Sequence, residues 1–219
     1  MLSQNNLAYR EAEETLGQWH PLVDQLGSTE GLVTLGNVSG SLQLQRVDSL
    51  ASLRALLEAY QTQMLIPIEL PAIQRAYLHA VRTETRELIA FDQQMAGEPV
   101  LQNFAPASRR IGQFLLKRLR PLRDDRLLQR YLRAVEEKRA HGWHTLVFGV
   151  TLALYSLPVR QGMVAFERQM LRGFINTVAR SLRLSESDCS GLLDEVCLDL
   201  NRSLETDLLS EELCEIRFR

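Results

Sequence analysis

Cysteine is scarce in this chain of 219 residues, and its three cysteines, Cys189, Cys197 and Cys214, all lie near the C-terminal end. An odd number of clustered cysteines does not make a disulfide framework, and neither a CxxC pair nor a Cys/His spacing typical of zinc occurs. We therefore expect free thiols in a reducing cytoplasm, with no bound metal and no cofactor.

Glycine, proline and aromatic residues are also few: the chain holds 12 Gly and 7 Pro, and aromatics make up 6% of it. Low Gly and Pro together with many Leu, Ala, Arg, Glu and Gln favour helices. No segment makes a convincing strand. We predict an all-α fold, a single-domain orthogonal or antiparallel bundle of about eight helices.

An excess of charge of one sign is missing as well, since 25 Lys and Arg stand against 27 Asp and Glu. This balance argues against a general nucleic-acid binder and against a polybasic membrane binder. Residues 140–159 carry no charged side chain, but the His, Thr, Tyr and Pro among them favour a buried core helix over a membrane span. The N-terminus lacks a basic start followed by an apolar run, so we expect a cytoplasmic protein without a secretory signal.

Periodicity and capping residues place the expected elements along a single domain of residues 1–219. Asp48 is predicted to cap one helix, Pro67 and Pro71 mark the start of another, and Ser185 with Asp188 has capping-box spacing. The predicted helices cover residues 6–26, 48–61, 67–95, 106–121, 124–140, 143–158, 171–182 and 185–208. Residues 27–47 are expected to form an irregular Gly-rich loop region, and residues 205–219 a flexible tail.

Catalytic motifs are absent: the sequence contains no GxSxG, GxxxxGK[ST] or GxGxxG pattern. His141 and His144 are spaced i and i+3 and could share a helix face. No Asp, Glu or Cys lies beside them to complete a metal shell, so capping or packing at the helix start is the favoured interpretation. We predict no catalytic residue, no metal site and no enzymatic activity.

Local charge is uneven even though the total is balanced. Residues 108–139 hold 11 basic and 4 acidic side chains, whereas residues 185–219 hold 10 acidic and 3 basic ones. Such segments are either solvated helix surfaces or a basic and an acidic docking surface for protein partners. Glycines within predicted helices, among them Gly112 and Gly149, indicate close approach of a second helix, because a mid-helix Gly costs about 1 kcal/mol relative to Ala.

Two sequence blocks resemble the urease accessory protein UreF family. Residues 108–113, Ser-Arg-Arg-Ile-Gly-Gln, are similar to the Ser-x-Arg-x-Gly block of that family. Residues 141–149, His-Gly-Trp-His-Thr-Leu-Val-Phe-Gly, resemble its Gly-His-x-x-Val-x-Phe-Gly segment. The order of the blocks matches, a basic helix separates them, and a long helix ending in Arg180 follows. The similarity covers roughly residues 50–200.

This resemblance implies a non-catalytic, all-α, dimeric maturation factor. Such proteins bridge a second accessory protein to a nickel-carrying GTPase, and together these load nickel into apo-urease. The partner-binding residues that the resemblance and the charge pattern suggest are Ser108, Arg109, Arg110, Gly112, Lys117, His141, His144, Phe148, Gly149 and Arg180.

Two regions depart from the family pattern. The N-terminal signature of the family resembles Leu-Pro-x-Gly-Gly-Phe-Ser-His-Ser-x-Gly-Leu-Glu, but the corresponding region here reads LVTLGNVSGSLQLQ, without Phe-Ser-His. The Pro-Leu-Gly-Gln turn of the family is replaced by residues 183–186, Arg-Leu-Ser-Glu. The missing signature favours a first alternative, a scaffold or chaperone of the same fold with a client other than urease. A second alternative is a nucleic-acid binder that uses the Arg-rich residues 108–139.

Overall fold

The computed structural model describes residue 42 and residues 47–102, 104–122 and 124–206, and within these ranges the chain is helical without strands. This confirms the predicted all-α fold. The elements are α4 (Leu50–Tyr60), the π-helix η1 (Gln61–Glu69), α5 (Leu70–Val81), α6 (Thr85–Met95), the 3₁₀ turn η2 (Pro99–Leu101), α7 (Ala105–Arg118), α8 (Arg126–Glu136), α9 (His144–Leu154), α10 (Val159–Ala179) and α11 (Glu186–Thr206). The predictions for residues 6–26 and 27–47 fall almost wholly outside the described residues, as does most of the predicted tail.

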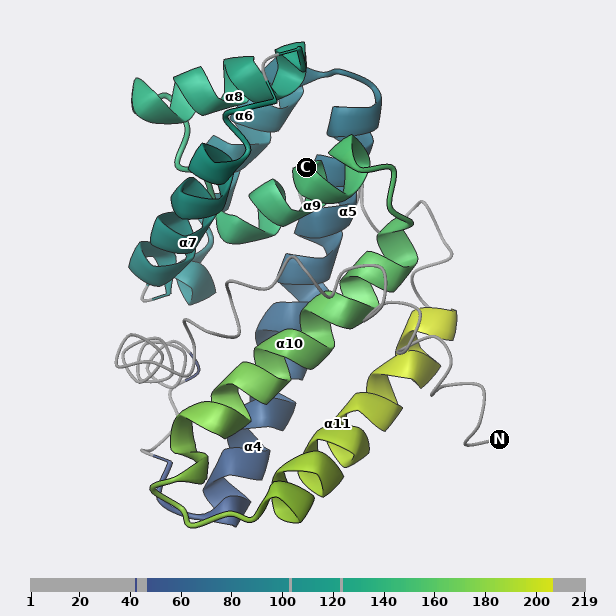
Figure 1. The fold of residues 1–219 in the computed structure, drawn as a ribbon. Helices are drawn as coiled ribbons and strands as arrows, with labels where there is room; N and C mark the ends of the chain where they lie inside the picture. The colour runs from purple at the N-terminus through teal and green to yellow at the C-terminus, as the bar shows by residue number, and fades with distance from the viewer. Residues whose placement is uncertain (1–41, 43–46, 103, 123, 207–219) are drawn as a thin grey trace.

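The helices α4 and α5 form one continuous rod through η1, so the predicted break between residues 61 and 67 is wrong (Figure 1). Pro67 lies inside the rod, where an α-helix would lose a hydrogen bond and clash with the carbonyl of the preceding turn. The wider π-helical winding accommodates it: the amide of Leu70 donates to the carbonyl of Leu65, five residues back. The N-cap of the rod is Ser49, not Asp48, and Ser49 exchanges hydrogen bonds with Ser52.

The predicted helix 67–95 is divided at Thr83, which adopts a left-handed backbone with φ of 57°. The amide of Glu84 donates to His79 and that of Thr83 to Ala80, the two hydrogen bonds of a Schellman motif. The sequence did not predict this helix end because the left-handed position is usually occupied by Gly, and here it is occupied by Thr.

Three more helices end in the same way, without glycine. Lys138 after α8, Ser156 after α9 and Arg183 after α10 have φ of 60°, 53° and 54°. In each case the next residue donates its amide to a carbonyl five residues back, as when Arg139 donates to Ala134 at 2.8 Å. These turns reverse the chain sharply and let α9, α10 and α11 fold back onto the preceding elements.

Two groups of helices pack along the rod. Helices α10 and α11 lie beside its α4 end, and α6 to α9 gather around its α5 end (Figure 1). The buried amide of Gln61 ties the first group together, donating to Glu167 of α10 at 2.8 Å and to the carbonyl of Val196 of α11 at 3.0 Å. The predicted capping box is confirmed, because Ser185 and Asp188 donate backbone amides to each other's side chains at the start of α11.

Candidate partner-binding site

The two sequence blocks meet in space. A Cβ atom added to Gly112 of α7 would lie 2.1 Å from the carbonyl oxygen of Gly142 and 2.7 Å from the amide of His144. The Gln113 side chain donates to the carbonyl of His141 at 2.9 Å. We call this contact between residues 108–113 and residues 141–149 the junction. It explains why a glycine stands at position 112, since any side chain would push the second block away.

Ser108 links the same two segments through its hydroxyl. Its Oγ lies 2.6 Å from Nδ1 of His144 and also accepts the backbone amide of His144 at 3.3 Å. His144 is the first residue of α9, so Ser108 satisfies one of the amides that a helix start leaves unpaired. The imidazole stacks on Phe166 and meets Phe104 edge-on, with ring centroids at 5.3 and 5.7 Å.

A buried carboxylate continues this contact into the rod. Oε1 of Glu69 lies 3.9 Å from Nε2 of His144, and Glu69 accepts a hydrogen bond from the hydroxyl of Tyr60. Burial lowers the pKa of His144 to about 3 and raises that of Glu69 to about 7. A serine, a histidine and a carboxylate in this order also occur in hydrolases. Here, however, Ser108 and His144 are only 1% and 0% exposed. A histidine whose pKa is this low is also a poor general base at neutral pH. The arrangement is a buried contact between η1, α7 and α9, in which Ser108 and His144 are hydrogen-bonded and Glu69 lies 3.9 Å from the imidazole.

Asp92 of α6 holds the loop that carries the second block. Its carboxylate accepts the backbone amides of His141 and Gly142 and the hydroxyl of Tyr131, the last two at 2.9 and 2.6 Å. Its own carbonyl accepts the indole N–H of Trp143 at 3.0 Å. Gly142 has φ of +71°, a conformation that favours glycine. The loop entering α9 is thus fixed from α6, α7 and α8 at once.

Further along α9, Gly149 packs on the rod. A Cβ atom there would meet the carbonyl oxygen of Ile73 at 2.3 Å and Cβ of Ala76 at 3.0 Å. The neighbouring Phe148 is buried against Phe166, with ring centroids 5.2 Å apart. The close approach that the sequence predicted for Gly112 and Gly149 is therefore confirmed, and the backbone of α5 lies against that of α9.

The predicted partner-binding residues divide into a buried and an accessible group. Ser108, Gly112, His144, Phe148 and Gly149 are buried. Arg109 and His141 are half-buried, and the guanidinium of Arg109 lies over the Trp143 ring at 4.5 Å. Arg110 and Lys117 are exposed on α7. The structure does not bring Arg180 to the others, because it caps the end of α10 far from α9 (Figure 1).

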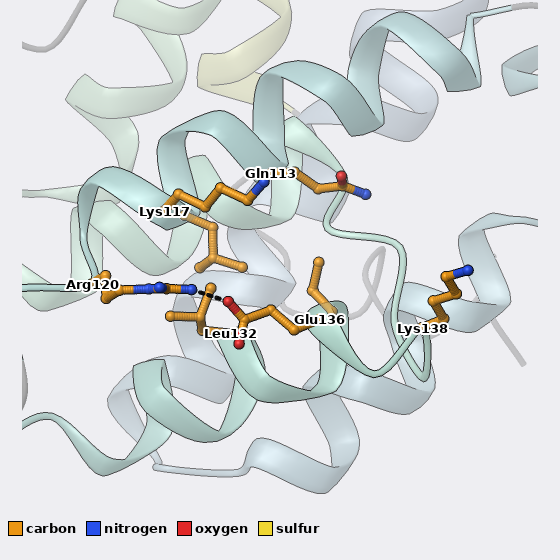
Figure 2. A pocket seen from close by; sticks show the side chains of 8 residues that line it. Gln113, Lys117, Arg120, Leu132, Glu136 and Lys138 are labelled. Atoms are coloured by element: carbon orange, nitrogen blue, oxygen red, sulfur yellow. Dashed lines mark hydrogen bonds and ion pairs between the residues drawn. The ribbon is translucent and has the colours of Figure 1, made fainter.

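Lys117 borders a groove of about 730 Å³ between α7 and α8, shown in Figure 2. Leu116, Leu132 and Val135 contribute its apolar floor, and the remaining lining residues are Gln113, Lys117, Arg120, Glu136 and Lys138. Arg120 and Glu136 form an ion pair across it. Gln113 therefore belongs to both the junction and the groove.

Comparison with known proteins fits this geometry. The UreF family profile matches residues 47–197, which include both blocks, the junction and the groove. The chain belongs to the UreF family. It is 24% identical over 193 residues to a protein from Actinobacillus pleuropneumoniae named urease accessory protein UreF, covering 88% of this chain and 85% of that one. Proteins of the same name from serotypes 3 (strain JL03) and 5b (strain L20) of that species are 23% identical, with equal coverage.

His141 and His144 of this UreF chain are not placed as a pair on one helix. Helix α9 begins at His144, so His141 precedes the helix and the two histidines do not share a helix face. In the described ranges no group of three or more His, Cys, Asp or Glu side chains could hold a metal ion. Nor does any helix there have the length and apolar content needed to cross a membrane.

The sequence did not predict a role for residues that lie outside the two blocks of this UreF member but contact the junction. Asp92 and Glu69 are the two most important, and both are at most 1% exposed. A signal for each exists in the sequence. Asp92 falls on the apolar stripe of α6 formed by Leu88, Phe91 and Met95, and Glu69 stands between Ile68 and Leu70. A carboxylate at a core position needs a hydrogen-bonding partner, and that requirement points to such a network.

Replacing Glu69 by Gln should change how stability depends on pH. The folded pKa of Glu69, about 7, lies above the ordinary value of 4.5, so the folded state retains a proton that the unfolded chain loses. The free energy of unfolding of the wild type, relative to Glu69→Gln, should therefore fall between about pH 5 and 7 by roughly 1.4 kcal/mol per pH unit and level off above. Urea titrations at several pH values measure this difference; a constant difference would contradict it.

Proposed function

We propose that this chain is a non-catalytic assembly factor that bridges a second accessory protein and a nickel-carrying GTPase, so that nickel enters apo-urease. Membership in the UreF family carries this proposal, and its relatives are named urease accessory proteins. The junction supports it, since the two blocks that define the resemblance build one buried contact instead of a reactive site. On this proposal the chain is a cytoplasmic homodimer, made of one domain over residues 1–219, that binds neither nucleic acid nor membrane.

The predicted partner-binding residues have two roles in this proposal. The five buried ones set the position of the loop 141–143 and of α7, and a partner does not touch them. The side chains that would contact a partner directly are the accessible ones, namely Arg110 and Lys117 on α7 and Arg109 and His141 at the edge of the junction. Arg180 would serve a separate contact at the far end of α10.

A scaffold of the same fold with another client is the second candidate. The observation in its favour is the sequence of residues 27–47, which lacks the Phe-Ser-His element of the family signature. Purification of the tagged chain from its own organism separates the candidates: urease subunits or a nickel-binding GTPase should copurify if the first is correct, and another metalloenzyme if the second is.

Deletion of this chain should leave urease present but without nickel. In the deletion strain we expect low urease activity and a low nickel content of the purified urease. Both should be restored when the chain is supplied again. Urease activity in lysates and nickel content of purified urease are the measurements. A deletion strain with fully active, nickel-loaded urease would contradict the proposed function.

A further inference from the structure

We propose that the groove between α7 and α8 binds an acidic, partly apolar segment of a partner protein. This inference rests on the proposed function, in which the chain holds several proteins together, and it names the chemistry of one contact. Gln113 lines the groove and also donates to the carbonyl of His141 in the junction, so an occupant would sit beside the contact between the two sequence blocks.

The charges in the groove favour an anionic occupant. Its rim carries Lys117, Arg120 and Lys138 against a single acid, Glu136. Arg120 pairs with Glu136, which neutralises both side chains (Figure 2). Within the part of the chain that the structure describes, the ammonium groups of Lys117 and Lys138 have no ion-pair partner. Lys117 on α7 and Lys138 after α8 therefore leave the groove lining with a net positive charge that the carboxylates of an occupant would balance.

Lys138 occupies its place at the cost of backbone strain. It holds the left-handed position of the Schellman motif that ends α8, with φ of 60° and with the amide of Arg139 bonded to Ala134. Glycine is the usual residue there because it adopts this conformation without a Cβ clash. Thr83, Ser156 and Arg183 hold the same position at other helix ends, and what distinguishes Lys138 is that its turn borders the groove.

The apolar part of the lining favours a peptide over a nucleic acid. Leu116 and Leu132 in the floor are buried by the chain itself, Val135 is half-buried, and Phe114, three residues before Lys117 on α7, is 43% exposed beside the groove. Leucine-like side chains of a partner would cover Val135 and Phe114. A phosphate backbone would leave both uncovered and would meet the carboxylate of Glu136. An amphipathic acidic helix satisfies both features of the groove.

The first test uses a defined probe in place of an unknown partner. The probe is a fluorescent synthetic helix of about 14 residues, roughly four turns, with Glu on one side and Leu on the other. Fluorescence anisotropy should show binding by the full chain that weakens as salt rises. Amide chemical shifts should change around residues 113–120 and 132–138. A probe with Lys in place of Glu, and a probe with Ser in place of Leu, should both bind more weakly.

A pair of matched variants assigns the effect to the groove. Lys138→Gly with Lys117→Gln removes both ammonium groups and relieves the strain at position 138. Each lost charge should lower the affinity for the acidic probe about twofold to fivefold. The control is Arg183→Gly with Arg160→Gln, which removes one cation from an equivalent left-handed helix end and one from an exposed helix start, both outside the groove. The control should keep wild-type affinity, and the groove variant should remain at least as heat-stable as the control.

The outcomes separate this inference from the proposed function. Equal binding by both variants, shifts outside the groove, or tighter binding of a single-stranded oligonucleotide than of the acidic probe would each overturn the inference. If the acidic probe binds the groove but the purified urease accessory proteins and apo-urease bind both variants equally, the groove serves another client and the urease role of this surface is rejected. If the groove variant loses binding to the accessory proteins and the control variant does not, the result supports both the inference and the proposed function.

Discussion

Adding one methyl group at Gly149 should destabilise the protein strongly. The Cβ of Gly149→Ala would lie 2.3 Å from the carbonyl oxygen of Ile73, a backbone atom inside the central rod. Neither helix can yield locally, since α5 and α9 are packed along their lengths, so the helices must separate. We expect a loss of about 3 kcal/mol or more, at the upper end of overpacking effects.

Gly191 provides the matched control for this substitution. It also lies inside a helix, α11, but a Cβ atom there has no neighbour within 4 Å. Gly191→Ala should therefore stabilise the protein by about 1 kcal/mol, the difference in helix propensity. Urea unfolding followed by far-ultraviolet circular dichroism measures both. Effects of the same sign for the two variants would contradict the close packing of α9 on α5.

Helices were predictable wherever the amphipathic pattern and a strong boundary coincide. Pro106 in the first turn of α7, the acid that caps α8 and the Ser185/Asp188 box each mark a helix start in the sequence, and the structure has a helix at each. Helix ends were harder, because Thr83 adopts a left-handed backbone without being Gly or Asn. Its conformation is imposed by the Schellman hydrogen bonds and by packing of the flanking helices, and neither is visible in local sequence.

The rod shows the opposite failure, in which a boundary signal is overridden. Pro67 would end an ordinary α-helix, but the buried residues on either side of it, among them Met64 and Ile68, keep the chain in the core. The π-helical segment resolves the conflict. The contact between the two blocks could not be predicted from the sequence either, although the sequence shows both blocks and both glycines. The contact depends on where α7 and α9 cross, and only the tertiary structure sets that point.

Asp92→Ala should have the other large effect, and for an electrostatic reason. The substitution removes the acceptor of three buried donors: the amides of His141 and Gly142 and the hydroxyl of Tyr131. An unpaired buried donor costs about 1–3 kcal/mol, and some of the three will be rehydrated, so a total loss of about 3–5 kcal/mol is expected. Amide hydrogen exchange should show faster exchange at residues 141–143 than elsewhere in the variant.

Tyr131→Phe is the control that separates the loop from the side chain. It removes one donor and leaves the carboxylate of Asp92 bonded to both amides, so a loss of only about 1 kcal/mol is expected, with residues 141–143 still protected. If Asp92 served only to pair with Tyr131, both variants would lose similar stability and the loop would exchange equally in both. A larger loss in Asp92→Ala, with exchange raised at the loop, means that α6 holds the second sequence block against the first.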